Sequence, residues 1–172
     1  MRNIYLVGFM GSGKSSVGRA LADRLGLAFL DLDERLAVEF GMPIHEVFER
    51  YGEARFREAE RQALSWSTGL EATVVATGGG AFCSRVNRDL IHGAGGGSVF
   101  LDVPWEVIRR RLAGDQSDRP KFVDVESAGR LYADRRPHYL QARWTVELAG
   151  SDSPRTAAER IVTVIAEAPC AT

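Results

Sequence analysis

The chain has 172 residues, of which 45% are hydrophobic and 26% charged, so we expect one globular domain rather than a disordered chain. Its 22 basic and 23 acidic residues leave a net charge of −1, which gives no support to a nucleic-acid-binding or membrane-surface protein. No segment approaches the roughly 20 apolar residues of a membrane span. Glycines break the amino-terminal apolar run, which is a poor signal peptide, so we expect a cytoplasmic protein.

Short apolar segments alternate with helical segments along the whole chain. The expected strands cover residues 3–8, 28–31 (running on into 33), 73–76, 98–103 and 144–148. The expected helices cover residues 16–25, 34–40, 44–51, 54–66, 84–91, 104–113, 125–139 and 154–168. Because the strands are almost continuously apolar, this alternation predicts a single three-layer α/β domain over residues 1–172, with a five-stranded parallel sheet covered by helices on both faces.

A glycine-rich turn follows the first strand. Gly8 to Ser15 reads GFMGSGKS and fits the phosphate-binding pattern G-x-x-x-x-G-K-[ST] completely. Its glycines let backbone N–H groups surround a phosphate, and the helix that follows adds positive partial charge. Lys14, one of two lysines in the chain, can reach the β- and γ-phosphates of ATP, and the Ser15 hydroxyl can ligate Mg²⁺.

Two carboxylates, Asp31 and Asp33, come at the end of the second expected strand. Alternation along an extended segment would point both to the same side, where one could serve Mg²⁺ and the other an attacking hydroxyl. The alternative is a purely structural role in which Asp33 caps the helix that starts at Glu34.

Further candidate residues have structural alternatives of the same kind. Arg57 could bind a substrate carboxylate or simply pair with Glu53 one helical turn away. The run Thr77-Gly78-Gly79-Gly80 after the third strand could be a flexible turn or a close approach of backbone to a ligand. Residues 114–124 could be a lid that closes over ATP or an ordinary surface loop.

The motifs GFMGSGKSS, DLD, GEARFREAE, ATGGG, DRP and RRPHY, in this order and spacing, resemble those of the shikimate kinase family over nearly the whole chain. The resemblance implies a nucleoside-monophosphate-kinase-like P-loop fold, with a substrate-binding region at about 32–62 and a lid at about 114–124. It also implies transfer of the ATP γ-phosphoryl group to the 3-hydroxyl of shikimate, with Mg²⁺, in chorismate and aromatic amino-acid biosynthesis. A monomer is expected, with shikimate and ATP as its partners.

The resemblance assigns roles by position. It implies catalytic roles for Lys14, Asp33 and Arg119, and a metal site at Ser15 and Asp31. Shikimate is expected to contact Asp33, Arg57, Glu60, Gly79, Gly80, Arg135, Phe48 and Phe56. ATP is expected to contact Gly11, Ser12, Gly13, Lys14, Ser15, Ser16, Arg111, Arg119 and Ser153. Lys121-Phe122 departs from the family pattern, in which two leucines usually follow the arginine-proline of the lid.

Three ambiguities remain within this interpretation. Adjacent helical residues point about 100° apart, so only one of Arg135 and Arg136 should face the pocket, and the family match selects Arg135. Arg109, Arg110 and Arg111 are consecutive, so the register of the arginine near adenine is open. Other hypotheses are a different small-molecule P-loop kinase, such as a gluconate kinase, and a nucleotide-binding homologue without catalytic activity.

Overall fold

A computed structural model describes residues 2–114 and 125–167. Its sheet has five parallel strands in the spatial order β2-β3-β1-β4-β5. The strands are β1 (Ile4–Val7), β2 (Ala28–Asp31), β3 (Thr73–Ala76), β4 (Gly97–Asp102) and β5 (Trp144–Glu147). The five strands and their parallel arrangement are as the sequence predicts.

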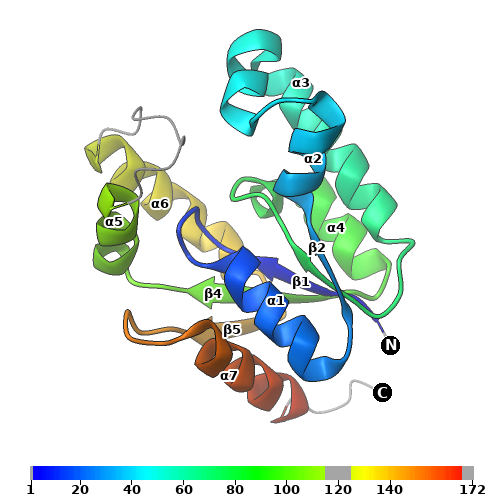
Figure 1. Cartoon of the computed structure of the whole chain (residues 1–172), viewed down its shortest axis with the longest axis vertical. Coiled ribbons are helices and arrows are strands. Elements are labelled where there is room, and N and C mark those ends of the chain that lie inside the picture. The colour runs from blue at the N-terminus through cyan, green and yellow to red at the C-terminus, as the bar shows by residue number, and fades with distance from the viewer. Residues whose placement is uncertain (1, 115–124, 168–172) are drawn as a thin grey trace.

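The helices cover both faces of this sheet (Figure 1). They are α1 (Lys14–Leu25), α2 (Leu32–Phe40), α3 (Ile44–Ser67), α4 (Arg85–Gly93), α5 (Trp105–Gly114), α6 (Val125–Tyr139) and α7 (Pro154–Glu167), together with the short 3₁₀ helix η1 (Ala81–Cys83). Helices α1 and α7 pack side by side on one face, and α4 lies on the other. None of the described helices is long and apolar enough to cross a membrane.

The hydrophobic core lies in the central strands. All four residues of β1 and all four of β3 are buried, because helices cover these strands from both sides. Because all the strands run parallel, their carboxyl ends lie at one edge of the sheet, where ligands of such folds bind. Helix α2 and the first part of α3 project from the body of the molecule beside this edge (Figure 1).

The boundary between the second strand and the helix after it differs from the expected one. The second strand ends at Asp31 and helix α2 begins at Leu32, so the expected strand into residue 33 is wrong. The Asp31 carboxylate accepts hydrogen bonds from the backbone N–H groups of Asp33 and Glu34, which starts the helix there. The expected break between two helices is confirmed inside α3, where Gly52 has the non-helical angles φ 77° and ψ 165° and kinks the segment between two helical parts.

Candidate active site

The turn between β1 and α1 has the conformation that its glycines allow. Gly8, Gly11 and Gly13 have φ values of 144°, 75° and 94°, in the region that favours glycine. The Lys14 ammonium donates hydrogen bonds to the carbonyl oxygens of Gly8 and Phe9, both at 2.9 Å, so the side chain folds back over the turn. This is the geometry of a phosphate-binding loop that ends at a helix N-terminus.

Ser15 and Asp31 meet beside this loop. The Ser15 hydroxyl donates a hydrogen bond of 2.5 Å to Oδ2 of Asp31, while Oδ1 of Asp31 accepts the backbone bonds that start α2. A hydroxyl and a carboxylate oxygen are hard donors of the kind that Mg²⁺ takes in P-loop proteins. The described residues contain no group of three or more His, Cys, Asp or Glu side chains that could hold a metal.

Asp33 points to a different place from Asp31. A Cβ at Gly78 would lie 2.8 Å from Oδ1 of Asp33 and 2.5 Å from Oε1 of Glu60, so the glycine makes room for both carboxylates. The expectation that Asp31 and Asp33 share one side of an extended segment is wrong, because Asp33 already belongs to the first turn of α2. The alternative cap by Asp33 is also wrong, since Asp31 is the capping residue.

The two arginines expected to bind a carboxylate face the next two glycines of the same loop. A Cβ at Gly80 would lie 2.5 Å from Nη1 of Arg57, and one at Gly79 would lie 3.8 Å from Nη1 of Arg135. The Gly79 position is also 3.3 Å from the backbone nitrogen of Met10, which belongs to the phosphate-binding turn. The loop therefore joins the two arginines to the nucleotide side of the site.

Ion pairs and apolar rings hold Arg57 in this position. Its Nη1 donates to Glu60 at 2.8 Å and its Nε donates to Glu53 at 3.2 Å, so the alternative pairing with Glu53 exists together with the site contact. The rings of Phe48 and Phe56, with centroids 4.4 Å apart, lie 5.9 and 5.3 Å from its guanidinium carbon. These contacts leave one face of a rigid cation directed to the glycine loop.

The carboxylate of Glu60 is almost fully buried, at 1% exposure of the residue. Burial raises its pKa above the ordinary value, Arg57 acts against that rise, and Asp33 adds to it. For Arg57, burial alone would lower the pKa, but the attraction of Glu60 and Glu53 outweighs it and the pKa lies above its ordinary value. The cation therefore remains charged at any physiological pH.

The remaining residues expected to contact ATP lie in different parts of the structure. Nη1 of Arg111 donates to the Gly11 carbonyl at 3.0 Å, whereas Arg109 pairs with Glu106, so Arg111 is the arginine of this run that reaches the phosphate-binding turn. Ser153 lies just before α7, where its hydroxyl accepts from the backbone nitrogen of Thr156. The expected lid, with Arg119, Lys121 and Phe122, lies outside the described residues apart from Gly114.

Sequence reasoning missed Tyr139, which helps to hold this site together. Arg136, which is not expected to face the pocket, pairs with Asp102, its Nη2 lying 2.5 Å from Oδ2. Tyr139 donates a 2.5 Å hydrogen bond to the Gly79 carbonyl. Tyr139 lies in the motif RRPHY, four residues after Arg135, and this helical spacing was the signal that could have found it.

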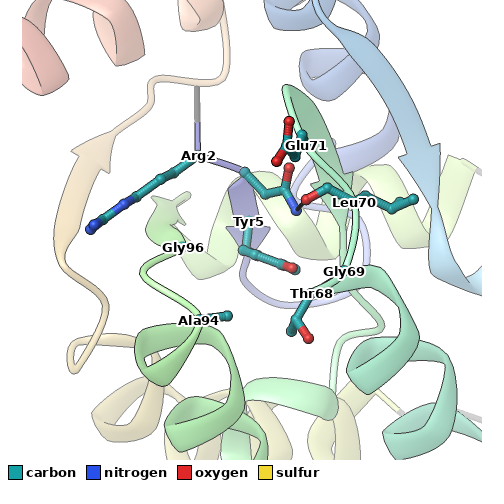
Figure 2. A pocket seen from close by; sticks show the side chains of 9 residues that line it. Arg2, Tyr5, Thr68, Gly69, Leu70, Glu71, Ala94 and Gly96 are labelled. Carbon is teal, nitrogen blue, oxygen red and sulfur yellow. Dashed lines mark hydrogen bonds between the residues drawn. The ribbon is translucent and has the colours of Figure 1, made fainter.

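A separate hollow of about 330 Å³ lies at the other edge of the sheet, where the strands begin (Figure 2). Arg2, Tyr5, Thr68 and Glu71 are among the residues that line it. It contains none of the expected site residues.

The site has a phosphate-binding loop, a carboxylate and a hydroxyl suited to Mg²⁺, and two arginines beside a glycine loop. These features define a P-loop kinase that acts on a small anionic substrate. The shikimate kinase family model matches residues 10–166. A shikimate kinase of Geobacter sulfurreducens is 44% identical over 168 residues, covering 96% of this chain and 89% of that protein. One of Sulfurihydrogenibium is 40% identical, covering 96% of this chain and 98% of that protein.

Comparison with solved structures indicates the same family. The shikimate kinase of Acinetobacter baumannii in complex with shikimate aligns with a TM-score of 0.89 and 36% identity, covering 96% of this chain and 93% of that one. A gluconokinase of Sinorhizobium meliloti, with a TM-score of 0.57 and 20% identity, shares the fold alone. The chain belongs to the shikimate kinase family, whose members phosphorylate shikimate with ATP.

Proposed function

We propose that this chain transfers the γ-phosphoryl group of ATP to the 3-hydroxyl of shikimate, giving shikimate 3-phosphate and ADP, within chorismate biosynthesis. One observation carries the proposal: Arg57 and Arg135 face adjacent glycines of a loop that touches the phosphate-binding turn. Shikimate has one carboxylate and three hydroxyls, and a planar guanidinium can bind a carboxylate through two parallel hydrogen bonds.

In this proposal the carboxylate lies against Arg57 and Arg135, and the backbone of Gly79 and Gly80 contacts the ring. Phe48 and Phe56 form the apolar wall beside Arg57. Asp33 holds the acceptor hydroxyl and takes its proton during transfer. Phosphoryl transfer depends on positioning and charge neutralisation more than on covalent chemistry by the protein, and this division of roles meets that need.

At the nucleotide side, the turn from Gly11 to Ser16 holds the phosphates, with Lys14 as the cation and Arg119 as a second one from the lid. Arg111 and the backbone near Ser153 border the base. Ser15 and Asp31 would hold Mg²⁺, which would neutralise negative charge on the phosphates during transfer. We also propose a monomer, because one chain supplies both arginines, both carboxylates and the phosphate-binding turn, and a cytoplasmic location for an enzyme of this biosynthetic family.

The test is an ADP-release assay with ATP and Mg²⁺, run with shikimate, with gluconate and with neither. We expect ADP release only with shikimate, accompanied by shikimate 3-phosphate identified by mass and phosphorus resonance. A Lys14→Ala variant that remains folded by circular dichroism should lose turnover, which excludes a contaminating kinase. Faster turnover of gluconate than of shikimate would overturn the proposal.

A further inference from the structure

One face of helix α6 fastens the helix to the rest of the site. Tyr132, Arg135, Arg136 and Tyr139 have the spacing i, i+3, i+4, i+7, which places them on a single helix face. Tyr132 donates to the Val103 carbonyl at 3.0 Å, and Arg136 pairs with Asp102 at the end of β4. Arg135, between these anchors, is therefore aimed by the contacts of its neighbours on the helix.

Tyr139 is the anchor at the carboxyl end of this face. Its residue is 0% exposed, and its ring packs on Phe100 with centroids 5.3 Å apart. Its hydroxyl donates to the Gly79 carbonyl at 2.5 Å. Burial raises the pKa of Tyr139 well above its ordinary value, Cys83 adds to the rise, and Arg135 opposes it, so the hydroxyl keeps its proton and remains a donor.

The bond acts on the peptide group between Gly79 and Gly80. A trans peptide is planar, so a carbonyl held in one direction fixes the following N–H in the opposite direction. Glycines on both sides of a peptide let it rotate at little cost, because neither residue has a Cβ and both accept many backbone angles. This peptide therefore needs an external partner to keep one orientation.

We propose that Tyr139 is a positioning residue for phosphoryl transfer: by holding the Gly79 carbonyl it aims the Gly80 N–H into the substrate pocket, in register with Arg135 on the same helix. The inference rests on the proposed function in that the pocket is taken to receive shikimate. The tyrosine touches neither substrate nor nucleotide in this account. It acts through the peptide and through the helix that carries Arg135.

The other carbonyls of this segment are held within it or from α4. The Gly78 carbonyl accepts from the Ala81 nitrogen, and the Gly80 carbonyl accepts from the Cys83 nitrogen. Asn87 donates to the Ala81 carbonyl at 2.9 Å. Loss of the Tyr139 hydroxyl would thus free the Gly79–Gly80 peptide while its surroundings stay in place, which makes a conservative substitution informative.

The experiment compares Tyr139→Phe with Tyr5→Phe in the full chain. Both substitutions remove one buried hydroxyl and keep the ring. The Tyr5 hydroxyl lies 3.3 Å from Ser67 Oγ, and Tyr5 lines the hollow at the opposite edge of the sheet (Figure 2). Tyr5→Phe therefore measures the cost of losing a buried hydroxyl away from the substrate pocket.

We expect Tyr139→Phe to raise the KM for shikimate roughly tenfold, the effect of one lost hydrogen bond, while the KM for ATP changes less than about twofold. Tyr5→Phe should change neither. The backbone amide order parameter of Gly80, measured by ¹⁵N relaxation without ligands, should fall in Tyr139→Phe and not in Tyr5→Phe.

Equal kinetics and an equal Gly80 order parameter in the two variants would overturn the inference. If Tyr139→Phe does not fold, 4-fluorophenylalanine at position 139, which fills the space of the hydroxyl but cannot donate, is compared by the same two readouts, with the same expected changes. If the wild-type protein does not turn over shikimate, the proposed function fails. The Gly80 order parameters still decide whether Tyr139 holds this peptide.

Discussion

The guanidinium groups of Arg57 and Arg135 lie over adjacent residues of one loop, although α3 carries the first and α6 the second. The positions that a Cβ would occupy at Gly80 and Gly79 are 2.5 and 3.8 Å from their Nη1 atoms. The Gly79 position is also 3.3 Å from the Met10 nitrogen. A carboxylate bound by both cations would therefore lie next to the phosphate-binding turn.

Arg57→Ala should raise the KM for shikimate by roughly 10- to 100-fold, because hydrogen bonds to a charged group contribute about 1.5–3 kcal/mol. The KM for ATP should stay nearly unchanged, since Arg57 faces Gly80 and not the phosphate-binding turn. Arg57→Lys keeps the charge but loses the paired N–H donors, so its KM for shikimate should lie between those of the wild type and Arg57→Ala. Steady-state kinetics in both substrates measure this, and an equal loss of ATP affinity would refute the carboxylate-binding role.

Gly80→Ala should raise the KM for shikimate at least tenfold. The new methyl group would lie 2.5 Å from Nη1 of Arg57 and displace the guanidinium. Strain in the backbone is not the cause, because Gly80 has φ −97° and ψ −14°, which alanine adopts freely.

Gly93→Ala is the matched control for this substitution. A Cβ there would meet nothing within 4 Å, and Gly93 ends helix α4 away from the loop. Its kinetics should equal those of the wild type. If Gly80→Ala also keeps wild-type kinetics, Arg57 does not need its present position to bind substrate.

Arg135→Ala and Arg136→Ala should separate binding from stability, although the residues are adjacent. Arg135→Ala should raise the KM for shikimate by roughly 10- to 100-fold. Arg136→Ala removes a partly exposed ion pair with Asp102 and should lower the free energy of unfolding by about 1 kcal/mol, with a smaller effect on KM. Urea unfolding together with kinetics gives both quantities, and the reverse pattern would show that Arg136 is the substrate ligand.

Glu60→Gln should change how stability depends on pH. The pKa of Glu60 is raised in the folded protein, so the unfolded chain gives up this proton more readily, and wild-type stability falls as pH rises from the ordinary value of 4.5 through the raised one. Glutamine does not titrate, so the variant does not lose stability in this way as pH rises. The melting temperature of the variant should therefore rise relative to that of the wild type between pH 4 and pH 8. Parallel curves of melting temperature against pH would contradict the raised pKa.

Much of this fold can be predicted from the sequence because the signals are local. The apolar strands and the glycine-rich turn follow from residue pattern alone, and the expected helix at residues 125–139 matches α6. The start of α2 could not be predicted by alternation, because the side chain of Asp31 turns back to cap the helix. Helix-capping chemistry and strand periodicity compete there, and the cap prevails.

The site was less accessible to sequence reasoning. The paired glutamate and arginine of α3 have an ordinary helical spacing, and only the tertiary structure shows that they approach Gly78 and Gly80. The spacing of Tyr139 from Arg135 indicates its helix face, but its bond to Gly79 joins segments far apart in the chain, so the sequence does not reveal that partner. Such contacts are set by how α6 packs against the sheet.

The most direct test of the account compares kcat/KM for shikimate with kcat/KM for its methyl ester, which lacks the negative charge but keeps the hydroxyls. If Arg57 and Arg135 bind the carboxylate, the wild-type protein should prefer shikimate by roughly 100-fold or more, since charge-assisted bonds to both arginines are lost with the ester. In the variant with both arginines changed to alanine, that preference should nearly vanish. Equal kcat/KM for acid and ester in the wild-type protein would contradict the account.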